Sequence, residues 1–79
     1  MMKISRHARN NLRLYSIQEA DLIEALACPD REEREGERRV AIKKFPARWG
    51  GFPLKVAYQG TKAGALIITA YPLKKKHWR

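Results

Sequence analysis

The sequence predicts an α+β fold in which two N-terminal helices pack on an antiparallel sheet of three to four strands. Apolar residues recur at helical spacing up to about residue 28, and from about residue 39 they alternate with polar ones. Glycine and proline separate the alternating segments, as turns require. A sheet needs cover on one face, and the amphipathic helices are the available cover. We therefore expect one layer of helix on one sheet.

The first helix is expected to follow a short strand-like stub at the N-terminus. Ser5 is a suitable N-cap, because a serine hydroxyl can accept a bond from an amide in the first turn. Ala8, Leu12 and Tyr15 then recur at helical spacing. These three residues predict the face that this helix buries.

The second helix is expected to begin at Ser16. The Ser16 hydroxyl and the Glu19 carboxylate have the spacing of a capping box, in which each side chain bonds the other residue's backbone amide. An apolar stripe then continues to Cys28. Pro29 and Asp30 are expected to end the helix.

The sheet is expected within residues 31–73. The charged run 31–39 has no apolar anchor and is compatible with either a loop or the exposed edge of a first strand. Gly50-Gly51 indicates a turn, and residues 60–64 indicate a hairpin connection. Strands are expected at residues 39–45, 54–59 and 65–71.

The 79 residues carry 17 Lys and Arg against 8 Asp and Glu, a formal net charge of +9. This length allows a single domain, residues 1–79, with a helical half (1–30), the sheet (31–73) and a basic tail (74–79). All eight acids lie in residues 1–40, which are neutral overall, whereas residues 41–79 carry nine Lys and Arg and no acid. A half of one sign favours a polyanionic partner, nucleic acid first. Solubility is the alternative explanation.

Several classes of function fit the composition poorly. Cys28 is the only cysteine, which excludes an intramolecular disulfide and favours a cytoplasmic protein. The longest apolar run, Ala65 to Ile68, is far shorter than the roughly 18 residues of a membrane span. Two histidines and one cysteine without ligand spacing predict no metal site, and no phosphate-binding glycine loop is present. We therefore expect no cofactor and no membrane partner.

The remaining polar residues suit cleavage of RNA without a metal. Such cleavage needs a base for the 2′-hydroxyl, an acid for the leaving 5′-oxygen and cations for the charge that develops on the phosphate. The alternative for His7 is a local hydrogen bond at the start of its helix. The candidates are His7, His77 and Tyr71 for proton transfer, and Arg6, Arg9, Arg13, Lys74, Lys75 and Lys76 for the phosphate.

Aromatic residues interleave with cations in two stretches, around Trp49 and in the tail. Aromatic rings stack on unpaired bases while neighbouring cations bind the phosphates. The alternative for Trp49 and Phe52 is to cover the open end of the small sheet. The candidates for nucleic-acid binding are Lys43, Lys44, Arg48, Trp49, Lys74, Lys75, Lys76, His77, Trp78 and Arg79.

Several short motifs carry a resemblance to a known family. The run Ile4-Ser5-Arg6-His7-Ala8-Arg9 is followed by Ile17 and by an acidic helix ending Cys28-Pro29-Asp30. This order resembles the opening of the family catalogued as domain of unknown function 4258. The segments LKVAY (54–58) and IITAY (67–71) are similar to two later strands of that family. The resemblance covers nearly the whole chain in the right order.

The resemblance implies a RelE/BrnT-like fold, which many small bacterial toxin ribonucleases share. By position, His7, Thr69 and Tyr71 match motif residues of the family. The chain departs from the family at Asn11 and Tyr15, which replace arginines, at Ser16, which replaces glycine, and at Gln18, which replaces serine. The two lost arginines would have stabilised a cleavage transition state, and Arg9 and Arg13 on neighbouring turns are expected to compensate in part.

Three functions remain as expectations. The first is a toxin-like, metal-independent endoribonuclease with the catalytic set His7, Arg9, Arg13, Thr69 and Tyr71, and with Lys74 on the phosphate. The second is a non-catalytic module that binds RNA or DNA through the basic sheet and tail. The third is a partner that docks on an acidic antitoxin-like protein through its basic half. A homodimer through an exposed sheet edge is compatible with each.

Overall fold

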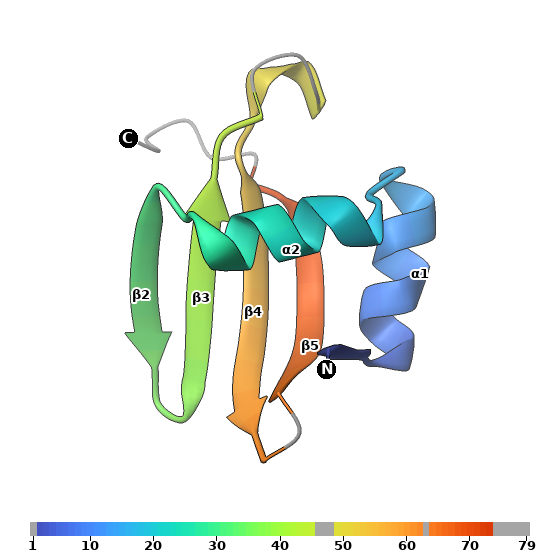
Figure 1. Cartoon of the computed structure of the whole chain (residues 1–79). Coiled ribbons are helices and arrows are strands. Elements are labelled where there is room, and N and C mark those ends of the chain that lie inside the picture. Colours follow the sequence, from blue (N-terminus) through green and yellow to red (C-terminus); the bar gives the residue numbers. More distant parts are fainter. Residues whose placement is uncertain (1, 46–48, 63, 74–79) are drawn as a thin grey trace.

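The computed structural model describes residues 2–45, 49–62 and 64–73, and it confirms the α+β fold (Figure 1). Two N-terminal helices pack on a five-stranded, mostly antiparallel sheet of order β1-β5-β4-β3-β2. The radius of gyration is 11.7 Å. No helix in the described ranges has the length and apolarity to cross a membrane. The elements are β1 (Met2–Ile4), α1 (Arg6–Leu14), α2 (Glu19–Ala27), β2 (Arg31–Glu35), β3 (Arg38–Lys43), a 3-10 turn η1 (Trp49–Gly51), β4 (Leu54–Thr61) and β5 (Gly64–Pro72).

The sheet has five strands rather than the expected three to four. Its two edge strands are hard to predict from the sequence, because one has only three residues and the other consists of charged residues. The N-terminal stub is a strand, β1, which pairs in parallel with β5 through Met2–Ile4. The charged run forms β2, which pairs antiparallel with β3 across a two-residue turn at Gly36-Glu37. Gly36 has a φ of +66°, a conformation that glycine adopts without a steric penalty and that suits the first position of such a turn. No alternation of apolar residues marks β2, whereas β1 has the short alternation Met2, Lys3, Ile4.

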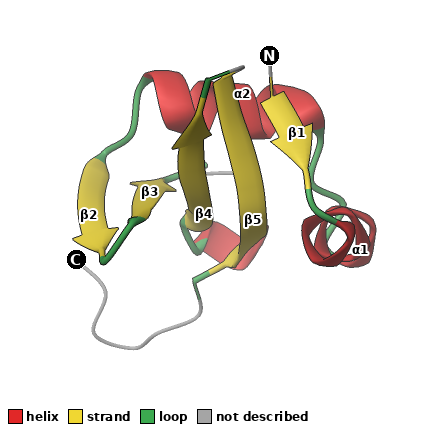
Figure 2. Ribbon diagram, turned by 90° about the horizontal axis from the view of Figure 1, so that it is seen from below, coloured by secondary structure: helices red, strands yellow, loops and turns green. Residues whose placement is uncertain are grey.

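The main core lies between the sheet and α2. Figure 2 shows α2 across one face of the sheet and α1 beside the edge formed by β5 and β1. Leu22 of α2 is fully buried against Leu54 and Val56 of β4 and Ile67 of β5. Burying a leucine side chain contributes about 1.5–3 kcal/mol, so Leu22 is one of the residues that hold α2 on the sheet.

Ser5 fixes the position of α1 and confirms the expected N-cap. Its hydroxyl oxygen accepts a bond from the Ala8 amide at 3.1 Å and donates one to the Ile68 carbonyl at 2.8 Å. The Ser5 amide also donates to the Ile67 carbonyl at 3.0 Å. Ile68 lies where the β4–β5 register shifts, so the cap joins α1 to an irregularity in β5.

The expected start of the second helix at Ser16 is wrong. Ser16 has a φ of +54°, and the Ile17 amide donates to the Leu12 carbonyl at 2.8 Å. This is the geometry of a helix C-terminus that reverses the chain, in which Ser16 belongs to the end of α1. The capping box of α2 is formed instead by Gln18 and Asp21, and the Gln18 amide donates to the Asp21 carboxylate at 2.9 Å.

Candidate nucleic-acid interface

The face of the sheet opposite α2 carries a second, smaller apolar cluster. Val40 and Ile42 of β3, Ala57 of β4 and Leu73 are buried in it, and Tyr71 of β5 packs against it. These strand residues alternate with those of the main core, since Ala57 follows Val56 and Tyr71 follows Ala70. No helix among the described elements crosses this side of the sheet (Figure 2). We call it the open face.

Lys55 and Tyr71 form one unit on the open face. They are directly paired across β4 and β5, and the Lys55 ammonium lies 5.8 Å from the centre of the Tyr71 ring. A cation at this distance from an aromatic face is attracted to it, by about 0.5–1 kcal/mol at exposed sites. Both side chains are partly exposed. The unit thus places a positive charge and a flat aromatic ring next to each other.

A polar pair lies beside this unit, where α1 meets β5. Thr69 is two residues before Tyr71, on the same side of the strand. The Asn11 side-chain amide of α1 donates to the Thr69 hydroxyl oxygen at 3.3 Å. The sequence indicated Thr69 as a site residue and Asn11 only as a departure from the family, and it did not predict their pairing, because the two residues are 58 positions apart.

His7 lies on the same flank of α1 as Asn11. The two residues are four positions apart, which places them one above the other along a helix. His7 is exposed. A turn of about 5.4 Å separates His7 from Asn11, and two strand residues, about 7 Å, separate Thr69 from Tyr71. His7 is therefore about one helical turn from the Asn11–Thr69 pair along α1, and Tyr71 is two residues from it along β5.

The two arginines expected to assist His7 point elsewhere. Arg9 and Arg13 are each two positions from Asn11, a rotation of about 200° around the helix axis. Both are exposed. α1 therefore presents its imidazole along one flank and these guanidinium groups along another.

Lys43 and Lys44, two further candidates that the structure describes, contact the segment that follows α2. Lys43 is at the end of β3, and its ammonium donates to the Cys28 carbonyl at 3.1 Å. The Lys44 amide donates to the Asp30 carboxylate at 2.7 Å. Phe52 is exposed next to η1. Arg48, Lys74, Lys75, Lys76, His77, Trp78 and Arg79 lie outside the described residues.

Trp49 has a structural role in the described part of the chain. Its indole N–H donates to the Tyr15 carbonyl at 2.7 Å, and its ring meets Phe45 edge-on, with centroids 5.2 Å apart. Trp49 also has a φ of +50°, a strained value for a residue with a side chain. The ring therefore joins η1 to the end of α1, as in the alternative that assigned it to cover one end of the sheet.

In the folded chain, acidic and basic residues are separated more completely than by dividing the sequence after residue 40. The first acid in the chain is Glu19, so α1 carries three arginines and no acid. α1 packs against β5, near one edge of the sheet. β2, which holds Glu32, Glu33 and Glu35, forms the opposite edge (Figure 1). The acid-free region is therefore α1 together with β5 and β4. A positive surface of this kind attracts polyanions.

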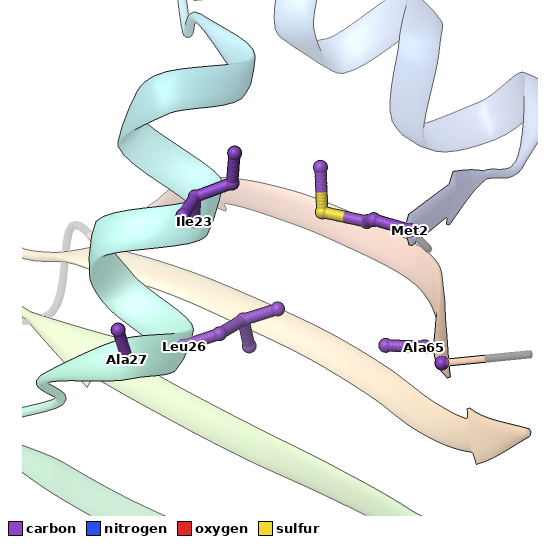
Figure 3. A pocket seen from close by; sticks show the side chains of 6 residues that line it. Met2, Ile23, Leu26, Ala27 and Ala65 are labelled. Carbon is purple, nitrogen blue, oxygen red and sulfur yellow. The ribbon is translucent and has the colours of Figure 1, made fainter.

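A separate groove of about 350 Å³ lies between α2 and the ends of β1 and β5. Figure 3 shows Met2, Ile23, Leu26, Ala27 and Ala65 around it, and these side chains are all apolar. The groove therefore offers no group for proton transfer or anion binding. Among the described residues there is also no group of three or more His, Cys, Asp or Glu that could hold a metal ion.

Comparisons with known proteins add no assignment. No protein-family model, no curated protein and no solved structure matches this chain. The resemblance to the domain of unknown function 4258 family stays a prediction, and the function has to be argued from the residues of the chain itself.

Proposed function

We propose that this chain binds single-stranded RNA across the open face of its sheet. The observation that carries the proposal is the Lys55 ammonium at 5.8 Å from the centre of the Tyr71 ring, on directly paired residues of β4 and β5. A base can stack on the ring while the ammonium neutralises an adjacent phosphate. Sheets that bind single-stranded RNA use aromatic residues on an open face in this way.

The polar pair beside the ring supports RNA rather than DNA. Thr69, two residues from Tyr71 along β5, and its partner Asn11 together offer both hydrogen-bond donors and acceptors. The 2′-hydroxyl of RNA is a donor and an acceptor, and it is the group by which proteins distinguish RNA from DNA. Lys55 on the open face and the absence of acids from α1, β5 and β4 support binding of the phosphate backbone.

The proposal is tested by fluorescence anisotropy with a labelled single-stranded RNA of mixed sequence. Tyr71→Leu keeps an apolar side chain on the Val40 and Ile42 cluster but removes the ring. Because stacking contributes about 1–3 kcal/mol per base, this variant should raise the Kd about 5- to 150-fold. Tyr71→Phe retains the ring and should bind like the original chain. Phe52→Leu removes another exposed aromatic ring and is the matched control.

Two results would contradict the proposal. If Tyr71→Leu binds RNA as tightly as the original chain, any binding is through charge alone and the ring has no role. If single-stranded DNA of the same sequence binds as tightly as RNA, the assignment of the polar pair to the 2′-hydroxyl is wrong.

A second candidate function is metal-independent cleavage of the bound RNA, as expected of a toxin-like endoribonuclease. One observation favours it: His7 is exposed on the flank of α1 that carries Asn11, the partner of Thr69. However, a base and an acid that act on one phosphodiester must both reach hydrogen-bond distance of it. Since His7 is about one helical turn and Tyr71 two strand residues from the Asn11–Thr69 pair, binding ranks above cleavage.

Cleavage is tested by incubating the purified chain with the same RNA in EDTA. If the chain is a ribonuclease of this type, fragments form without metal and are lost in His7→Ala and Tyr71→Phe. Asn10→Ala changes another exposed residue of α1 and is the control for His7→Ala. If the RNA is still intact after prolonged incubation, the chain binds RNA without cleaving it.

A further inference from the structure

The outer edge of β2 has an unusual charge order. Its five residues, Arg31–Glu35, read Arg-Glu-Glu-Arg-Glu, and all five are exposed. β2 is the last strand in the sheet order, and no other described strand pairs with its outer side (Figure 1). An edge strand presents backbone donors and acceptors that a further strand can pair with. Which strand it accepts depends on the side chains along it.

We propose that β2 pairs antiparallel with β2 of a second copy of the chain, so that two sheets join across a two-fold axis. The axis passes between the two Glu33 residues. In this register Glu32 of each copy faces Arg34 of the other, and Arg31 of each faces Glu35 of the other. The two-fold axis makes each of these opposite-charge pairs occur twice. Opposite charges directly across a sheet stabilise the pairing, and like charges destabilise it.

The neighbouring registers are less favourable. A shift of one residue toward the N-terminus pairs Arg31 with Arg34 and Glu32 with Glu33, so every pair has like charges. A shift of one residue the other way pairs Glu32 with Glu35, which are like charges, and Glu33 with Arg34, which are opposite. A shift of two residues centres the axis on Glu32, where Arg31 faces Glu33, or on Arg34, where Glu33 faces Glu35. Within Arg31–Glu35, the register centred on Glu33 therefore makes the most opposite-charge pairs, Glu32 with Arg34 and Arg31 with Glu35, each of them twice.

The single like-charge contact in the proposed register is partly neutralised within each copy. The Arg31 side-chain Nε lies 3.4 Å from the Glu33 carboxylate on the same strand, and both side chains are about half exposed. Each Glu33 therefore approaches the axis with a cation beside it. The opposite edge of the sheet is the three-residue strand β1, with α1 beside it, so β2 is the longer edge open to pairing.

A charge exchange between two variants tests the register, measured by sedimentation equilibrium without RNA. R34E places glutamates opposite each other at both symmetry-related pairs, and E32R places arginines there. Each variant alone should raise the dimer Kd about tenfold or more. An equimolar mixture should form a heterodimer as tight as the original homodimer, because every such pair is again of opposite charge. R34E also faces Arg39 of β3 within its own chain, so the monomer stays folded, which circular dichroism verifies.

A disulfide trap tests the axis, in a chain that also carries Cys28→Ser. Directly opposed residues of antiparallel strands have Cα atoms about 4.5–5.5 Å apart, within the range of a disulfide. E33C should therefore cross-link two copies under mild oxidation. E32C faces an arginine of the other copy and should cross-link far less. A chain that stays monomeric throughout the concentration range, a mixture of variants that does not associate, or equal cross-linking by E32C and E33C would each overturn the proposal.

Discussion

The side-chain amide of Asn11 in α1 donates a hydrogen bond to the hydroxyl of Thr69 in β5 at 3.3 Å. This contact joins residues 58 positions apart; along α1 His7 is one turn from Asn11, and along β5 Tyr71 is two residues from Thr69. It is the point where the helix and the open face meet. Its contribution to stability is therefore also a measure of how firmly α1 is held beside the proposed RNA-binding surface.

A double-mutant cycle of Asn11→Ala and Thr69→Val should give a coupling energy of about 0.5–1.5 kcal/mol, the net contribution of one hydrogen bond. The free energy of unfolding is measured by urea denaturation followed by circular dichroism. If the two substitutions are additive, the bond contributes nothing to stability and α1 is held by its apolar contacts alone.

Ser5→Ala should lower the free energy of unfolding by about 1–2 kcal/mol. The substitution removes the acceptor of the Ala8 amide and the donor to the Ile68 carbonyl together. Ser5→Thr retains a hydroxyl and should recover most of the loss. A loss of equal size in both variants would show that the hydroxyl is not what stabilises the start of α1. Urea denaturation serves here too.

Trp49→Phe should lower the free energy of unfolding by about 1–2 kcal/mol, because the Tyr15 carbonyl loses the indole donor at 2.7 Å while the aromatic contact with Phe45 remains. The same substitution should leave RNA affinity unchanged, since Trp49 is not on the open face. If Trp49→Phe instead weakens RNA binding without changing stability, Trp49 is one of the residues that bind RNA.

Leu22→Ala should lower the free energy of unfolding by about 2–5 kcal/mol, because it opens a cavity between α2 and the sheet where Leu22 is fully buried. Leu14→Ala removes the same atoms from a side chain that is 70% exposed, and it should change stability by less than about 0.5 kcal/mol. Comparable losses at the two positions would contradict the assignment of the main core.

Lys55→Gln should reduce the dependence of RNA affinity on salt. A lysine that neutralises one phosphate of a single strand contributes about 0.7 to the slope of log K against log salt concentration. Titrations at several salt concentrations measure this slope. Lys62→Gln removes a cation from the far end of the β4–β5 hairpin and is the matched control. If Lys55→Gln leaves the slope of log K against log salt concentration unchanged, the phosphates of the RNA do not bind at Lys55.

Features that depend on neighbouring residues could be predicted from the sequence. The cap at Ser5 needs only a hydroxyl close to the amide of the first helical turn, and the predicted strands around residues 40, 56 and 68 follow from alternation of apolar and polar side chains. The α+β class follows from the same local patterns, because the helical segment precedes the alternating one.

Tertiary structure decided the features that depend on contacts between distant residues. Serine is a residue type favoured at helix N-caps, but the reversal of the chain after α1 places Ser16 at a helix C-terminus. β2 has no apolar pattern, and its assignment rests on hydrogen bonding to β3. The partner of Thr69 likewise depends on where α1 packs.

The sequence by itself determined that the chain is basic, that its acids are confined to residues 19–37, and that helices precede strands. Only the tertiary structure decided which cations share a surface. The sheet order places β2 with its acids at one edge and α1 without acids beside β5 at the other. Strand order is set by pairing between segments far apart in the chain, and no local pattern of residues encodes it. For that reason the acid-free surface and the charged edge of β2 emerge only in the folded chain.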